Sequence, residues 1–253
     1  MTSFVLVLAL INSTGMEVEW TNKTIHFYGP VNLDSDTSYL TELNSCLDSL
    51  LSTIPLDAER NMSDVANQSR EVDNYFQTAL SYAQIVSTRY STSGKVQNEY
   101  VISLVGPFIE EFIPRSSPSF NMRGGSEPNA MEEDAIPSIP NTGFVIDARG
   151  TGFRPGLLPR LLDADGNVLF DAGMVERGVI NERGYLQYAY SPRQALETRE
   201  LGLNPLRIVA EGAAGTNQCD LILPASATEE ITGSALNMRL LSECRVMIII
   251  DRQ

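Results

Sequence analysis

The sequence predicts an α+β protein of two domains, in which a small sheet covered by two helices is followed by a strand-rich α+β module. Three observations predict this class. The chain has 253 residues, a length typical of about two domains. Apolar residues recur at helical spacing in two early stretches. Short runs of β-branched and aromatic residues, separated by turn residues, occur along the rest of the chain.

The chain begins with an apolar segment. Residues 4–11 are an unbroken apolar run, and small residues follow at 12–15. The run is too short to span a membrane. We interpret residues 1–15 as a signal peptide, although the basic residues that usually precede such a run are missing. The alternative is a first buried strand.

We place the first domain at residues 16–114. Alternating apolar and polar residues at 16–20 and 25–28 predict a hairpin, on which His26 points away from Ile25 and Phe27. Helices are expected at 36–54, ended by Pro55, and at about 68–83. The last expected elements are strands at 85–90 and 96–105, joined by a turn at 91–94, and an amphipathic turn at 108–113.

Residues 115–141 are rich in proline and polar residues and have no periodicity, which predicts a linker or an exposed loop. We place a strand-rich α+β domain at residues 142–253. Strands are expected there at 144–148, 168–170, 185–190, 206–212, 220–223 and 246–250. Helices are expected at 193–201, capped by Ser191 and ended by Gly202, and at about 228–241.

Acidic residues dominate the charge. The 18 basic and 32 acidic residues give a net charge of −14, and residues 1–114 are the most acidic part. Because the chain has no overall positive charge to attract phosphates, we do not expect it to bind nucleic acid.

A candidate anion site follows the strand at 144–148. Asp147 and Arg149 lie on one face of that strand, and Arg154 follows a glycine-rich turn. These arginines are candidates for binding an anion or a carboxylate, and a structural ion pair is the alternative. The turn itself, Gly150 to Gly156, is not a dinucleotide loop, because its glycine spacing is wrong and we expect no βαβ unit after it.

A weak calcium-loop pattern follows at Asp163, Asp165, Asn167 and Asp171. Calcium loops need a bidentate acid at the twelfth position, which is Met174 here. The alternative is a hairpin turn between 161–162 and 168–170.

Cysteine and histidine are too scarce for a metal or hydrolase site. Cys219 and Cys244 could pair if the chain is exported, and separate buried thiols are the alternative. His26 is the only histidine, and we find no nucleophile that it could activate. We therefore expect no enzymatic activity and no cofactor.

Four stretches resemble bacterial envelope proteins with a domain of the Lpp-twenty lipoprotein type, a group similar to flagellar outer-membrane assembly proteins. They are GFVIDARGTGFRPGLLPRLLDADGNVLFD at 143–171, IVSTRYSTSGKVQNEYVISLVG at 85–106, and the pair NPLRIVAEG at 204–212 and ECRVMIIID at 243–251. The resemblance implies a lipoprotein-like first domain and a location in the periplasm or at the outer membrane. The lipid-accepting cysteine of such lipoproteins is missing, so at most peripheral membrane association is expected.

These observations lead to one expected function and one alternative. We expect a non-enzymatic, exported envelope protein that acts through contacts with other envelope proteins or with itself, in assembling or stabilising a surface structure such as the flagellum. The alternative is a periplasmic module that binds a small ligand, an anion or calcium through the residues named above.

Overall fold

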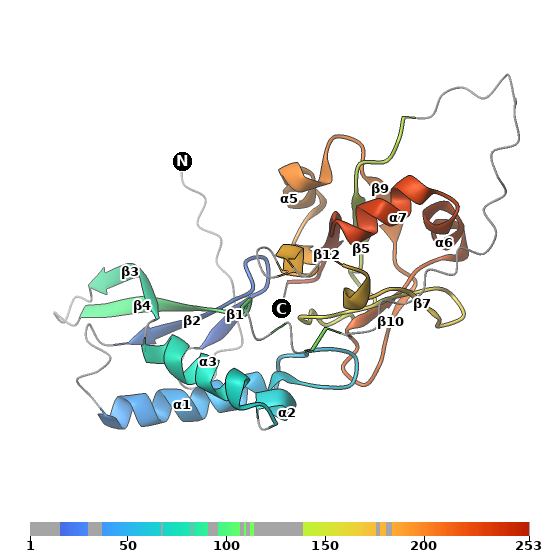
Figure 1. Cartoon of the computed structure of the whole chain (residues 1–253). Coiled ribbons are helices and arrows are strands. Elements are labelled where there is room, and N and C mark those ends of the chain that lie inside the picture. The colour runs from blue at the N-terminus through green and yellow to red at the C-terminus, as the bar shows by residue number, and fades with distance from the viewer. Residues whose placement is uncertain are drawn as a thin grey trace, which may run out of the picture.

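A computed structural model describes residues 16–29, 37–66, 68–81, 83–90, 96–106, 109, 112–113, 139–175, 178–180 and 184–252. The α+β class is confirmed, because the chain contains both helices and strands, and the strands form several sheets (Figure 1). The proposed signal peptide at 1–15, the turn at 91–94 and nearly all of the proposed linker lie outside the described residues.

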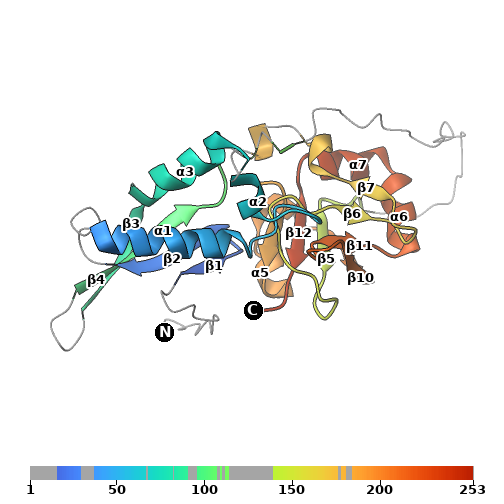
Figure 2. The same cartoon turned by 90° about the horizontal axis from the view of Figure 1, so that it is seen from below.

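The first part is an antiparallel sheet with helices on one face. Its strands are β1 (Glu17–Glu19), β2 (Thr24–Gly29), β3 (Gln84–Tyr90) and β4 (Val96–Ser103), in the order β1-β2-β4-β3. The helices are α1 (Thr37–Leu51), α2 (Met62–Ala66) and α3 (Arg70–Ser81). Figures 1 and 2 show α1 and α3 against the same face of the sheet. The predicted hairpin and its alternation are confirmed, because Ile25 and Phe27 are fully buried while His26 is half-buried.

The helices of this part differ in detail from the prediction. α1 ends at Leu51 instead of residue 54, since the chain turns at 52–54 and buries Ile54. α2 was not predicted, because five residues are too few to show helical periodicity.

The second part holds two further sheets. One is mixed and consists of β6 (Leu161–Leu162), β7 (Val168–Phe170), β10 (Gly212–Ala214) and β11 (Asp220–Ile222), in the order β10-β11-β6-β7. The other consists of β5 (Phe144–Asp147), β8 (Gln187–Ala189), β9 (Leu206–Val209) and β12 (Val246–Ile249), in the order β8-β12-β5-β9. Every strand pair of this second sheet is parallel.

The expectation that no βαβ unit follows the glycine-rich turn holds there, because the turn leads to β6, but the parallel sheet contains a β–α–β connection further along the chain. β8 and β9 belong to one parallel sheet and are connected through a helical segment, α5 (Pro192–Leu196) and the 3-10 helix η4 (Arg199–Leu201). The Ser191 cap is confirmed, because its side chain accepts a hydrogen bond from the Gln194 amide. The expected single helix at 193–201 is therefore two short ones.

Layers on both faces bury the parallel sheet. Figure 2 shows α5 on one side and, on the other, the mixed sheet with α6 (Ala225–Thr232) and α7 (Ala235–Ser242). The predicted helix at 228–241 is thus also two helices, since Ser234 caps a new one. All four residues of β12 are buried, as expected for a parallel strand covered on both faces.

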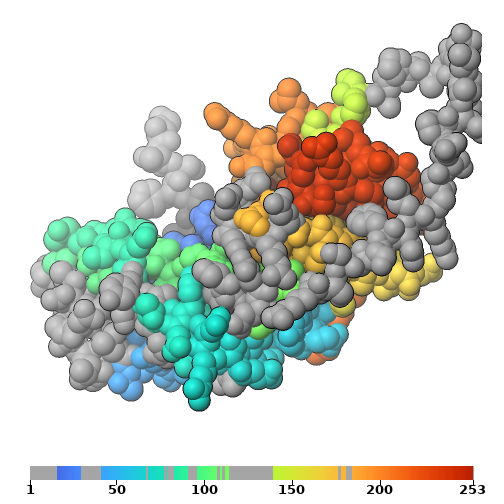
Figure 3. Space-filling view, in the orientation of Figure 1, coloured from blue at the N-terminus to red at the C-terminus, as the bar shows by residue number. Residues whose placement is uncertain are grey.

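The two parts share one continuous hydrophobic core. The loop 54–61 of the first part forms backbone hydrogen bonds with the second part: the amides of Leu157 and Leu158 donate to the carbonyls of Pro55 and Leu56 at 3.0 and 2.7 Å. Trp20 packs edge-on against Tyr188, with ring centroids 5.8 Å apart. The space-filling view in Figure 3 shows the two parts in close contact.

We predict that Gly215→Ala destabilises the protein much more than Gly150→Ala. Both glycines have positive φ, 83° and 75°, which costs an alanine about 1–2 kcal/mol. A Cβ at Gly215 would also lie 2.5 Å from the Cβ of Ala58 across the junction, whereas one at Gly150 meets nothing within 4 Å. Urea unfolding followed by Trp20 fluorescence measures both costs, and equal costs would show that the junction is not tightly packed.

Candidate functional site

The three residues of the predicted anion site do not converge. Arg149 forms a forked ion pair with Asp147, with its Nε 2.8 Å from Oδ1 and its Nη2 2.6 Å from Oδ2. The hydrogen bonds from Arg149 lower the pKa of Asp147. Arg154 instead donates from Nη2 to the carbonyl of Thr53 in the first part, at 3.2 Å. The region therefore fits the alternative, a structural ion pair between Asp147 and Arg149, because the turn at Gly150 and Gly152 directs Arg154 away from Arg149.

The predicted calcium loop is a hairpin turn. Asp163 accepts hydrogen bonds from the Asp165 and Asn167 amides and from the Asn167 side chain, and β6 and β7 pair on either side. These bonds lower the pKa of Asp163. Asp171 instead caps the 3-10 helix η3 (Ala172–Met174) through the Gly173 amide. No cluster of three His, Cys, Asp or Glu side chains suited to a metal occurs among the described residues.

Cys219 and Cys244 do not form the disulfide that the sequence left open. Both are present as thiols and both are buried, at 0% and 8% exposure. Burial raises the pKa of Cys219 well above its ordinary range. A buried thiol with a raised pKa is unreactive, so Cys219 acts as a small core residue.

His26 contacts a neighbouring hydroxyl on the same strand. Its Nε2 lies 3.0 Å from Thr24 Oγ1 and its Nδ1 lies 3.0 Å from Glu99 Oε1. Ser87 donates to the other oxygen of Glu99 at 2.6 Å. Burial alone would raise the pKa of Glu99, but the hydrogen bonds from Ser87 and His26 outweigh it and lower the pKa.

The order hydroxyl, imidazole, carboxylate is the one that hydrolases use to activate a nucleophile. β2 lies between β1 and β4, and its residues Thr24 to His26 are paired on both sides, so their amides belong to the sheet ladder and are not oxyanion donors. Thr24 and His26 are two residues apart on β2, so their side chains lie on the same face of the sheet. Their contact is one of a row of polar contacts, a polar ladder, on the face that α1 and α3 leave uncovered. Glu99 is distant in sequence, and only the pairing of β2 with β4 brings it there.

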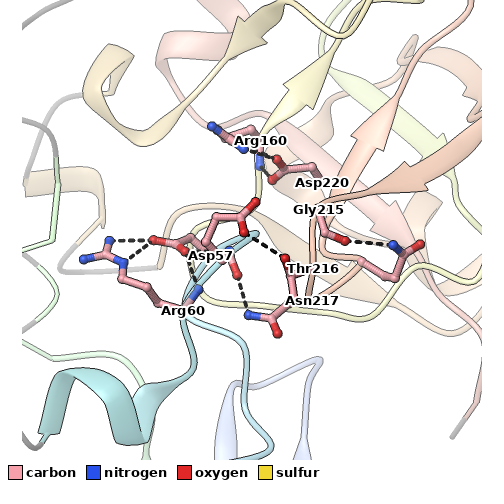
Figure 4. A network of polar contacts seen from close by, with 9 residues as sticks. Asp57, Arg60, Arg160, Gly215, Thr216, Asn217 and Asp220 are labelled. Carbon is pink, nitrogen blue, oxygen red and sulfur yellow. Dashed lines mark hydrogen bonds and ion pairs between the residues drawn. The ribbon is translucent and has the colours of Figure 1, made fainter.

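A polar network joins the two parts at the loop 54–61 (Figure 4). The Asn217 side chain donates to the Asp57 carbonyl at 3.0 Å, and Thr216 donates to Glu59 at 2.8 Å. Beside them, the buried Asp220 carboxylate accepts three hydrogen bonds from Arg160, at 2.6 to 2.9 Å. These contacts tie the loop 54–61 to the second part, so this network serves to fix the junction.

Lys23 is a functional candidate that sequence analysis missed. It lies at the turn between β1 and β2, is fully buried, and donates from Nζ to the Leu186 carbonyl of the second part. Burial lowers the pKa of Lys23 to about 8, although the nearby Cys244 opposes this shift. The only hint in the sequence is that lysine is rare, occurring at 23 and 95 alone.

The edge strand β3 exposes apolar side chains. Among the described strands it pairs with β4 only, and Ile85, Val86 and Tyr90 are 55%, 54% and 79% exposed. A bulge lies between Ile85 and Ser87. Figure 3 shows β3 at the margin of the molecule. An unpaired edge with exposed apolar residues is a ready site for pairing with another chain.

Comparison with known protein families gives a match in the second part of the chain. Residues 143–252 match the family model described as the second domain of Treponema pallidum Tp0624, which covers less than half of the chain. No curated protein matches the chain. The description of the matched family does not mention Lpp-twenty type lipoproteins, so that resemblance stays a prediction. None of the described helices is long and apolar enough to cross a membrane.

We predict that Lys23 makes stability rise at alkaline pH. The unfolded chain keeps the lysine proton up to about pH 10.5, whereas the folded chain loses it at about 8. The contribution of Lys23 to the free energy of unfolding should therefore rise between these two pH values, by about 3 kcal/mol at most, while the raised pKa of Cys219 acts in the opposite direction in both proteins. In Lys23→Met this gain disappears. Urea unfolding of both proteins across this range measures the difference, in which groups common to both cancel, and parallel curves would contradict the assignment.

Proposed function

We propose that this protein is a non-enzymatic protein of the bacterial cell envelope that acts through protein–protein contacts, in assembling or stabilising a surface structure such as the flagellum. The exposed edge strand β3 carries this proposal. Among the described strands only β4 pairs with it, so its other side can offer backbone hydrogen bonds, and Ile85, Val86 and Tyr90 offer apolar surface to a strand or loop of a partner. The envelope location rests on the resemblance of residues 85–106 and 143–171 to envelope proteins, and on the apolar run at 4–11.

The rest of the described surface supports binding over catalysis. The side chains of the junction bond across it to groups of the chain itself, and the hydroxyl–imidazole–carboxylate ladder lies on β2, whose amides at Thr24 to His26 take part in sheet pairing. The shared core also makes the two parts one body, which holds β3 at a fixed position relative to the second part. A rigid body with one open sheet edge is suited to bringing partners together.

The location is tested by fractionating cells of the native organism and following the untagged protein. We expect it in the periplasm or the envelope, with an N-terminus near Met16 when the fraction is analysed by mass spectrometry. Recovery in the cytosol with residues 1–15 intact would overturn the envelope location and leave the apolar run as part of the folded protein.

We predict that a photo-crosslinking amino acid at Ile85 captures a specific partner in intact cells. The matched control is the same substitution at Leu236, an exposed apolar residue on α7 that lies outside any sheet edge. Val86→Glu should reduce the crosslink from position 85 severalfold without changing stability, because this side chain is half exposed. The crosslinked band is identified by mass spectrometry; a partner protein or a second copy of this chain supports the proposal. Equal crosslinking from positions 85 and 236 would contradict it.

A further inference from the structure

The parallel sheet of the second part leaves the face of its edge strand β9 uncovered. Among the described strands β9 pairs only with β5, and α5 packs against β5, β8 and β12. Val145 of β5 is buried in the cluster under α5, whereas Arg207, its partner in register on β9, is exposed. Val209, two residues further along, is 71% exposed. An exposed apolar side chain on an edge strand marks a surface that another chain can cover.

The chain from 207 to 211 exposes every second residue. Arg207, Val209 and Glu211 are exposed, and the two residues between them are at most half-exposed or buried. The backbone stays extended past the end of β9, since the amides at 210 and 211 donate to carbonyls of β5 and β11 in turn. In an extended chain, alternate side chains lie on one side. The exposed side of this segment therefore presents a cation, an apolar side chain and an anion at equal spacing.

The two charges of this segment have no ion-pair partner within the described part of the chain. No ion pair there includes Arg207 or Glu211. They cannot pair with each other, because four residues of extended chain separate them by about 13 Å. Asp147, the partner of Val209 in register, is already paired with Arg149. Both charges are therefore available to a second molecule.

The segment is complementary to itself. A twofold axis through Val209 lays two copies antiparallel, with Val209 against Val209 and Arg207 of each copy against Glu211 of the other. Because the two charges are equally far from Val209, both ion pairs form at once. Opposite charges that face each other across antiparallel strands are stabilising, and like charges are destabilising. Twofold contacts of this kind are the commonest in soluble oligomers.

We propose that the protein forms a twofold homodimer through residues 207–211, so that a second copy of this chain covers the exposed face of β9. This surface is separate from β3, and the dimer does not depend on the proposed function. If that function also holds, the dimer carries two β3 edges and one particle can bind two partners.

Sedimentation equilibrium of the full chain at increasing concentration tests the proposal. We expect a monomer–dimer equilibrium that weakens as salt is added, because the paired charges lie at the surface. Arg207→Glu should raise the dissociation constant at least about tenfold, since it creates two pairs of like charges. Arg70→Glu is the matched control with the same change in net charge, because Arg70 is exposed at the start of α3. A chain that stays monomeric at about 1 mM, or equal effects of the two variants, overturns the proposal.

Exchanging the two charges distinguishes this contact from any other. Glu211→Arg alone should weaken the dimer as Arg207→Glu does. The double variant restores opposite charges across the axis and the net charge of the wild type, so it should dimerise about as tightly as the wild type. If the two single effects add instead, the two residues do not face each other and the proposal is wrong.

Two further variants locate the axis and separate this dimer from the edge of β3. Val209→Cys should form a disulfide-linked dimer under mild oxidation, because the axis brings the two copies of position 209 together. Leu203→Cys, which is also exposed but lies off the axis, should not. Val86→Glu, which tests the proposed function, should leave the dimer intact. Equal linkage from positions 203 and 209, or a dimer that Val86→Glu abolishes, overturns the proposal.

Discussion

The structure depends on the contact between the loop 54–61 and the second part of the chain. Backbone hydrogen bonds from Leu157, Leu158 and Asn217 to this loop act like the ladder of a sheet, although they join segments about 100 residues or more apart. They hold the first sheet against the second part, and the apolar side chains on both sides form one core. A shared core resists relative motion, because separating the parts would expose apolar surface and leave buried backbone groups unpaired.

Two charged side chains, Asp220 and Lys23, are buried close to this contact. Asp220 is fully buried, and Arg160 supplies all three of its hydrogen bonds. Lys23 is buried with a backbone carbonyl and the Tyr188 ring, whose centroid is 5.6 Å from Nζ, as its neighbours. Such groups add little net stability but penalise any arrangement that leaves them unpaired. The Asp220–Arg160 pair lies within the second part, whereas Lys23 bonds across the contact and therefore favours one way of docking the two parts. The same docking places the Lys23 amine near Cys244.

The two proposals use different parts of the molecule and different physics. The edge of β3 pairs with β4 alone among the described strands and has exposed apolar side chains, which suit a macromolecular partner. The segment 207–211 offers opposite charges on either side of Val209, which suit a second copy of this chain. The rigid junction connects these two surfaces. Either proposal can fail without the other, since no residue is common to the two surfaces. The cavity beside η4 and the end of α7 is lined by two arginines, two glutamates and Cys244, so its charged side chains balance.

The sequence by itself determined the local elements and which faces are buried. Alternation fixed the buried face of β2, helical spacing fixed α1 and α3, and the cap at Ser191 fixed the start of α5, because each depends on neighbours within a few residues. Only the tertiary structure decided the parallel pairing of β5, β8, β9 and β12, the separation of Arg149 from Arg154, and the meeting of Lys23 with Leu186 and Cys244. These features join residues far apart in the chain, and no local pattern encodes which distant segments will share a core.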